Sequence, residues 1–264
     1  MTAPQAWFIG WDVGAWNCEK NANSRDALVV LNPQGELVGK PWRGNLRDTI
    51  AAAASYTDWL FTVAKLCQFD DATKAVFATQ NVVMAIDTPL GFSNGLLQLL
   101  QGEAATTPFT ASCDNPYLYR HTERELFAHG FSPLSAVKDM IGSQATKGLH
   151  LLRKFGFTPS PSGVWQLNPS SQSNQNQYRA LESYPTVLKT SALVAEYIEQ
   201  LRSQTDFINW HQDIQDAAYC AIAALLFQQQ PNTMATPTED VTTEGWIYVP
   251  KECLTGVGKS SVFV

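Results

Sequence analysis

Two nearly continuous apolar runs that each end in an aspartate constrain the fold of this chain more than any other feature. Residues 6–11 precede Asp12 in WFIGWDVG, and residues 82–86 precede Asp87 in VVMAIDTPLG. A continuous apolar run is typical of a central strand whose two faces are both covered by helices. We therefore expect an α/β fold in which both aspartates lie at the carboxyl ends of buried strands.

The segments around these runs alternate between strand and helix patterns. Residues 32–35, Asn-Pro-Gln-Gly, are typical of a turn, so residues 27–31 and 36–40 are expected to extend the first strand into an antiparallel three-stranded meander. Residues 48–69 have apolar side chains at helical spacing. Later in the chain we expect short strands at 180–184 and 245–250 and helices near 191–202 and 213–229.

The middle of the chain, from about residue 93 to 179, is less regular. It has helical patterns at 122–129 and 143–155, and residues 168–177, NPSSQSNQNQ, are typical of a surface loop. We expect one domain over residues 1–264, with this middle segment as an insertion or cap over the sheet.

A second pair of aspartates opens the apolar helix DIQDAAYCAIAALLF. Asp213 and Asp216 are three residues apart and so share a helix face. A helix cap explains Asp213 well, but the helix dipole, which favours an acid at this end, explains Asp216 less well because the residues beside it are small and apolar. Buried carboxylates cost free energy unless a cation compensates them. Four such acids favour a divalent cation, Mg²⁺ or Mn²⁺, which prefers oxygen ligands.

The cysteine pattern argues against zinc. The five cysteines are far apart and form no Cys-x-x-Cys or Cys/His ligand spacing, which favours buried thiols in a reducing compartment. The first ten residues lack the pattern of a signal peptide, and no apolar run reaches membrane-spanning length. We therefore expect a cytoplasmic protein that does not enter a membrane.

The charge balance bears on the partners. The chain has 18 Lys and Arg against 24 Asp and Glu, a net charge of −6, which disfavours coating of nucleic acid through bulk charge but allows a local basic groove. The many aromatic residues allow a homodimer interface.

Several motifs, in this order, resemble those of known nucleases. GWDVG and DIQDAAYCAIAAL are similar to motifs of RuvC-type Holliday junction resolvases. More closely, IDTPLGF, YRHTERELF, ESYPTVL, DIQDAAYCAIAAL and EGWIYVP together resemble the DUF429 family of predicted ribonuclease H-like nucleases. The resemblance spans Trp7 to Pro250. It implies a ribonuclease H-like mixed sheet, with an antiparallel meander and then parallel strands, flanked by helices.

The same resemblance implies the site and its chemistry. Asp12, Asp87, Asp213 and Asp216 would be the catalytic, metal-binding acids of a nuclease that hydrolyses phosphodiester bonds in a nucleic acid. In such a site two Mg²⁺ or Mn²⁺ ions about 3.5–4 Å apart activate water and stabilise the leaving oxygen. Glu182 lies on the family's Glu-x-x-Pro motif, where it is either a metal ligand or a structural acid of a strand.

Basic residues of the middle segment could contact phosphate. Arg120 and Arg124 share a helix face in YRHTERELF, where they either bind substrate phosphates or pair with Glu123, Glu125 or another acid. Lys147 is expected to be a solvated lysine.

The residues leave other functions open. His211 is more typical of a structural residue at a helix start than of a proton-transfer group. One alternative is an ATP-dependent phosphotransferase or ATPase of the actin-like fold, with Asp12-Val13-Gly14 as a phosphate loop. Another is a non-catalytic member of the family that binds nucleic acid.

Overall fold

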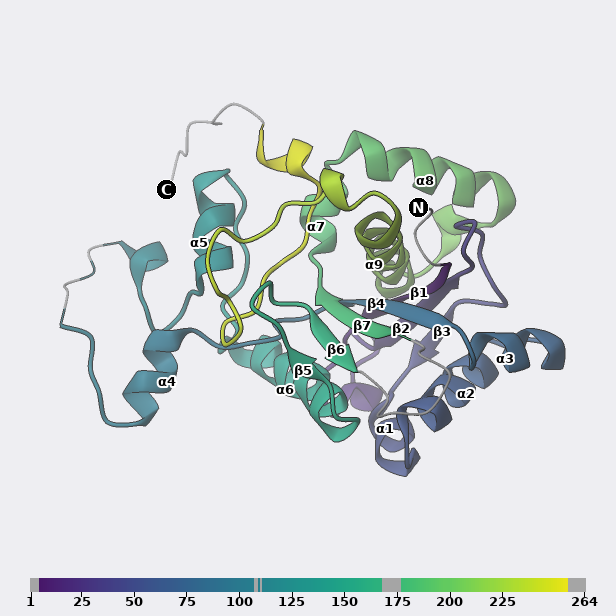
Figure 1. Cartoon of the computed structure of the whole chain (residues 1–264), viewed down its shortest axis with the longest axis horizontal. Helices are drawn as coiled ribbons and strands as arrows, with labels where there is room; N and C mark the ends of the chain where they lie inside the picture. The colour runs from purple at the N-terminus through teal and green to yellow at the C-terminus, as the bar shows by residue number, and fades with distance from the viewer. Residues whose placement is uncertain (1–4, 107–108, 110, 168–176, 256–264) are drawn as a thin grey trace.

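The computed structural model describes residues 5–106, 109, 111–167 and 177–255, which form a seven-stranded sheet with helices on both faces (Figure 1). The strands are β1 (Ala6–Asp12), β2 (Asp26–Leu31), β3 (Trp42–Gly44), β4 (Asn81–Asp87), β5 (Thr158–Pro159), β6 (Trp165–Leu167) and β7 (Tyr178–Glu182). The α-helices are α1 (Arg47–Ala52), α2 (Tyr56–Leu66), α3 (Asp71–Phe77), α4 (Asn94–Leu100), α5 (His121–Ala128), α6 (Asp139–Lys154), α7 (Pro185–Leu188), α8 (Ala192–Gln204) and α9 (Gln212–Gln229). The predicted α/β class is confirmed.

The sheet is mixed, and its order is β3-β2-β1-β4-β7-β6-β5. β3, β2 and β1 form an antiparallel meander, β4 and β7 run parallel to β1, and β6 and β5 return antiparallel at the far edge. The two apolar runs that end in aspartate are therefore the adjacent strands β1 and β4, each with a neighbour on both sides.

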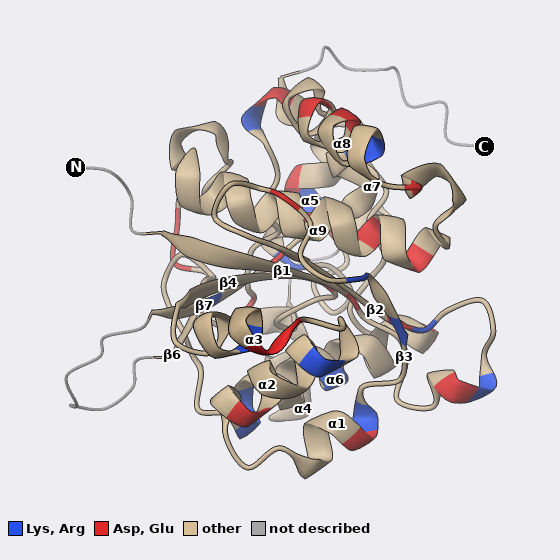
Figure 2. Cartoon of the chain, turned by 90° about the vertical axis from the view of Figure 1, so that its right-hand side faces the viewer, with Lys and Arg blue, Asp and Glu red and all other residues tan. Residues whose placement is uncertain are grey.

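Two apolar clusters, one on each face, hold the helices to the sheet. α8 and α9 cover one face, whereas α1, α2, α3 and α6 cover the other (Figure 2). α9 is apolar almost all round and packs against β1, where Gly10 permits close approach: a Cβ on Gly10 would lie 1.8 Å from the carbonyl oxygen of Ala217. This contact fixes the start of α9 relative to the strand ends.

The third strand of the meander lies later than predicted. Residues 36–40 form only a single bridge, between Leu37 and Leu31, and the third strand is β3. The reason is local: Gly39 has φ +65°, a left-handed conformation that interrupts an extended strand, and Pro41 follows with no N–H to donate.

The predicted helix over 48–69 is two helices, α1 and α2. The break comes at Ser55, whose side chain accepts the backbone N–H of Asp58 while the Asp58 carboxylate accepts the backbone N–H of Ser55. This reciprocal pair of hydrogen bonds starts a new helix.

Residues 245–250 do not form the predicted strand. Gly245 has φ +76°, and the Ile247 N–H donates to the Thr122 hydroxyl, so only isolated bridges join this segment to Glu182 and Met234.

The middle segment, 93–179, does more than cover the sheet, because it also supplies the edge strands β5 and β6. The loop predicted at 168–177 lies, apart from Gln177, outside the described residues.

Candidate functional site

Asp12 and Asp87 end β1 and β4 and lie directly opposite each other in the parallel register. Side chains alternate between the two faces along a strand, so Asp12 shares the face of Phe8 and Asp87 shares the face of Ala85. Both Phe8 and Ala85 belong to the apolar cluster under α9. The two carboxylates are therefore neighbours on the side of the sheet that α9 covers.

Burial and the charges of nearby acids make ionisation of these two acids unfavourable. Burial raises the pKa of Asp12 well above its usual value, and the charges of Asp87, Asp213, Asp216 and Asp26 raise it further. Burial likewise raises the pKa of Asp87 to about 8, with Asp216 adding to the shift and Lys189 opposing it. Within the described part of the chain, neither carboxylate has a hydrogen bond or an ion pair. The pair lacks the compensation that buried charges normally have.

Asp213 lies in the first turn of α9 and is held by cationic residues of the meander. Its carboxylate pairs with the Arg43 Nε at 2.8 Å and accepts the Arg25 backbone N–H at 2.9 Å. The cap of α9 is instead His211, whose Nδ1 accepts the backbone N–H of Asp213 at 3.2 Å. The interpretation of Asp213 as the helix cap is therefore wrong, and His211 has the structural role expected of it.

Asp216, one turn further along α9, also has a cation partner. Its carboxylate pairs with the Lys189 Nζ at 2.6 Å and accepts a hydrogen bond from the Gln212 amide at 2.9 Å. Lys189 follows α7, so this ion pair joins the end of α7 to the start of α9. The acids of α9 thus approach Asp12 and Asp87 closely enough to shift their pKa values, but each is already neutralised.

A cavity of about 270 Å³ opens beside the strand ends. Asp12 and Asp87 line it together with Ser183 and Tyr184, and an apolar wall comes from the segment that joins α5 to α6 and from the first turn of α6. A ligand in this cavity would lie in contact with the two uncompensated carboxylates.

Arg120 and Glu182 form a buried ionic cluster at the end of β7, and Glu123 and Glu182 line the same cavity as Asp12 and Asp87. The Arg120 guanidinium is fully buried and binds Glu182 through Nη1 at 2.8 Å and Nη2 at 2.6 Å, and Glu123 through Nε at 2.9 Å. Burial alone would lower the pKa of Arg120, but Glu123 and Glu182 raise it above its usual value. Pairing with acids, one of the two roles considered for Arg120, is what the structure shows, and its guanidinium is out of reach of a substrate phosphate.

Glu182 is held as a structural acid of β7. Both of its carboxylate oxygens contact Arg120, and one also accepts the Leu90 backbone N–H at 2.8 Å. Burial raises the pKa of Glu182, whereas Arg120 opposes that shift. To act as a metal ligand instead, Glu182 would have to break its ion pair with Arg120.

Arg124 does not line the cavity beside Asp12 and Asp87. Its side chain is half-buried on α5, and Nη1 donates to the Tyr119 carbonyl at 2.9 Å. No ion pair with Glu123, Glu125 or any other acid of the described residues holds it.

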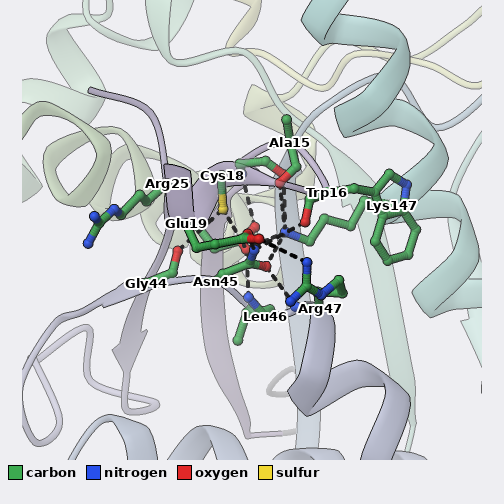
Figure 3. Close-up of polar contacts among 12 residues, drawn as sticks. Ala15, Trp16, Cys18, Glu19, Arg25, Gly44, Asn45, Leu46, Arg47 and Lys147 are labelled. Carbon is green, nitrogen blue, oxygen red and sulfur yellow. Dashed lines mark hydrogen bonds and ion pairs between the residues drawn. The ribbon is translucent and has the colours of Figure 1, made fainter. Parts of the chain in front are cut away.

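The sequence did not predict the buried ion pair between Asp26 and Lys147. Figure 3 shows Lys147 pointing toward Ala15 and Asn45. Both side chains are 0% exposed, and the Lys147 Nζ also donates to the Gly14 carbonyl at 3.2 Å and to the Asn45 side chain at 3.1 Å. The expectation that Lys147 is solvated is therefore wrong. A signal was present: Lys147 precedes Leu151 by four residues, on the apolar face of α6.

Asp26 also orders the turn after Asp12. It accepts the Gly14 N–H at 2.9 Å, the Trp11 indole N–H at 3.0 Å and the Leu46 N–H at 2.7 Å. Burial raises the pKa of Asp26, and Lys147 opposes that shift. The pair thus fixes the backbone that presents the Asp12 carboxylate.

Two of the four aspartates, Asp12 and Asp87, suit a divalent cation as the structure stands. In the residues that the structure describes, no three His, Cys, Asp or Glu side chains are arranged as ligands of one ion. Asp12 and Asp87 nevertheless suit such an ion, because they are adjacent, all-oxygen and without a cation. Asp213 and Asp216 would first have to release Arg43 and Lys189.

Comparison with known proteins gave no match to a family model, a curated protein or a solved structure. Among the described helices, none has the length and apolar character to cross a membrane.

Proposed function

We propose that this protein is a metal-dependent hydrolase of phosphodiester bonds in nucleic acid. One observation carries the proposal: Asp12 and Asp87 face each other at the ends of adjacent parallel strands, beside a cavity, with no cation of the described chain bound to either. Burial raises the pKa of both acids, and the charge of Asp87 raises the pKa of Asp12 further. A divalent cation between the two carboxylates would offset the free-energy cost of burying them in the charged form.

The sheet supports a ribonuclease H-like fold. Its core order, β3-β2-β1-β4-β7, is an antiparallel meander followed by parallel strands, and α9 packs on it, as the resemblance of the motifs implies. We interpret the chain as one such domain, in which residues 93–179 are an insertion that also widens the sheet.

Asp12 and Asp87 would hold the Mg²⁺ or Mn²⁺. Bound there, such an ion supplies an activated water and neutralises charge on the leaving oxygen. Other residues of the chain hold the site in place. The Asp26–Lys147 pair fixes the turn after Asp12. Arg43 and Lys189 hold Asp213 and Asp216 of α9 through ion pairs.

The actin-like alternative is less well supported. A phosphate loop needs free backbone N–H groups that point at the ligand. In the turn after Asp12, the Gly14 N–H donates to the Asp26 carboxylate instead. A nucleotide phosphate at this turn would have to displace a buried hydrogen bond.

Cleavage assays test the proposal. RNA, DNA, hybrid and branched substrates are incubated with Mg²⁺ or Mn²⁺ and with wild type, Asp12→Asn, Asp87→Asn and the control Asp71→Asn, whose side chain is fully exposed in an ion pair with Lys74. We expect cleavage of at least one substrate by wild type and Asp71→Asn, and a loss of at least about a hundredfold in the two site variants. Cleavage that survives in Asp12→Asn and Asp87→Asn, or no cleavage of any substrate, would refute it.

A further inference from the structure

A second, larger cavity adjoins the first. Its volume is about 660 Å³, and it is lined mainly by apolar side chains of α5 and the segment after it, among them Phe127, Ala128, Pro133 and Leu134. Pro133 and Leu134 also line the cavity beside Asp12 and Asp87. The two cavities therefore share a wall, so one extended ligand could occupy both.

The second cavity contains a cation that has no acid partner among the described residues. Arg124 lines it, and its one hydrogen bond to the described chain joins Nη1 to the Tyr119 carbonyl. The other guanidinium N–H groups have no partner in the part of the chain that the structure describes, so they can bind an anion. Arg120, four residues earlier on the same segment, is neutralised by two buried glutamates. The difference in pairing distinguishes a structural arginine from one that is available to a ligand.

The lining indicates a ligand with an apolar, planar body and an anionic group. The volume falls within the range of about 300–1,000 Å³ typical of small-molecule sites. Tyr119 and Phe127, whose rings meet edge to face at 4.9 Å, border the cavity, and aromatic side chains favour stacking with a flat ring. The Asp114 carboxylate, which also borders it, would disfavour an anion at its own end and so direct the anionic group toward Arg124.

We propose that this second cavity binds an unpaired nucleotide of the substrate strand, with its base against the apolar wall and its phosphate at Arg124. The inference rests on the proposed function, because the shared wall is what connects this nucleotide to the scissile phosphodiester. It adds the substrate class: a strand that is single or locally unpaired, since a base inside a duplex cannot leave its partner without a cost of a few kcal/mol.

Binding measured without metal tests the inference separately from cleavage. Fluorescence anisotropy of a labelled single-stranded oligonucleotide, as RNA and as DNA, is compared with the same sequence as a duplex, in the presence of a chelator. Arg124→Gln removes the cation and Ala128→Phe fills the cavity. The matched controls are Arg202→Gln and Ala195→Phe, which change an exposed arginine and an exposed helical alanine on α8.

We expect wild type and both controls to bind the single strand at least about tenfold more tightly than the duplex. Arg124→Gln and Ala128→Phe should each weaken single-strand binding about tenfold, with equal circular dichroism spectra showing that both fold. Absence of binding, equal binding of duplex and single strand, or unchanged binding in both variants would overturn the inference. Cleavage by wild type with unchanged binding in the variants leaves the hydrolase standing, whereas binding without any cleavage refutes the hydrolase alone.

Discussion

Buried carboxylates near the strand ends form two groups, one paired with cations of the chain and one without such a cation among the described residues. On the face covered by α1, α2, α3 and α6, Asp26 pairs with Lys147, and at the end of β7 Glu182 pairs with Arg120, so each of these acids has a cation inside the fold. On the face covered by α9, Asp12 and Asp87 have no cation bound among the described residues. The first arrangement holds the structure together, whereas the second prepares it to bind a cation from outside.

The comparison also separates the roles of the cations at the strand ends. Lys147 and Arg120 are fully buried and locked by several acceptors. Arg43 and Lys189 are partly exposed, with side-chain exposures of 17% and 36%, and each contacts one acid of α9. An exposed ion pair is weaker and exchanges more readily than a buried one. We therefore expect Asp216, whose partner Lys189 is the more exposed of the two cations, to be movable, and Asp26 and Glu182 to be fixed.

Of the changes to these ion pairs, removal of Arg120 should lower the stability of the fold most. Arg120→Met would leave Glu123 and Glu182 buried without a cation, which should lower the free energy of unfolding by about 3–5 kcal/mol or more. Urea unfolding measures the change. Arg120→Lys keeps the charge but loses the bidentate contact with Glu182, so we expect a smaller loss of stability in that variant. A loss in Arg120→Met below about 1 kcal/mol would contradict the comparison.

Lys147→Met should be nearly as damaging, because it leaves Asp26 buried and unpaired. We expect a loss of about 3–5 kcal/mol, partly restored when Asp26→Asn is added in the double variant. Lys74→Met, which breaks an ion pair whose Asp71 is fully exposed, is the control and should cost at most about 1 kcal/mol. Equal losses in Lys147→Met and Lys74→Met would show that burial of the pair does not matter.

Asp87, on the face covered by α9, should make the free energy of unfolding of the metal-free protein depend on pH. The pKa of Asp87 is about 8 in the folded protein against 3.8 ordinarily, so the folded state holds this proton more tightly than the unfolded chain. Its contribution to stability is therefore lost as pH rises toward 8. Between about pH 5 and pH 8 we expect a fall of up to about 1.4 kcal/mol per pH unit from this group.

The Asp87→Asn variant should show a smaller fall in the free energy of unfolding over this pH range, whereas the Asp71→Asn control should show the same fall as wild type. The measurement is urea unfolding with a chelator at several pH values. A wild-type stability that rises or stays level over this range, or an equal fall in Asp87→Asn, would show that Asp87 is not the group responsible.

The smallest effect is expected when the ion pair between Lys189 and Asp216 is removed. Lys189→Met would free Asp216, which should tighten Mn²⁺ binding by up to about fivefold, corresponding to the about 0.2–1 kcal/mol of a partly exposed pair. Isothermal titration calorimetry measures the affinity, with Lys74→Met as the control. Weaker binding in Lys189→Met would mean that Lys189 supports the cation site rather than competing with it.

The strands that end in Asp12 and Asp87 were predictable because continuous apolar runs are strong local signals, and the α9 helix was predictable for the same reason. The break at Ser55 was present in the sequence as a capping pattern but is easily overlooked inside a longer helical pattern. The Arg43–Asp213 pair joins residues 170 positions apart, and such a contact depends on how the meander and α9 pack. Burial of Lys147 likewise depends on the opposing Asp26, since a lysine on a helix is normally solvated.

Direct titration of Mn²⁺ into the metal-free protein tests whether Asp12 and Asp87 form a cation site. By isothermal titration calorimetry, wild type and Asp71→Asn should bind Mn²⁺ with the same affinity. Asp12→Asn and Asp87→Asn should each bind at least about tenfold more weakly, because each removes one of two adjacent carboxylate ligands. No binding to wild type, or equal affinity in all four proteins, would contradict the assignment of the uncompensated pair as a metal site.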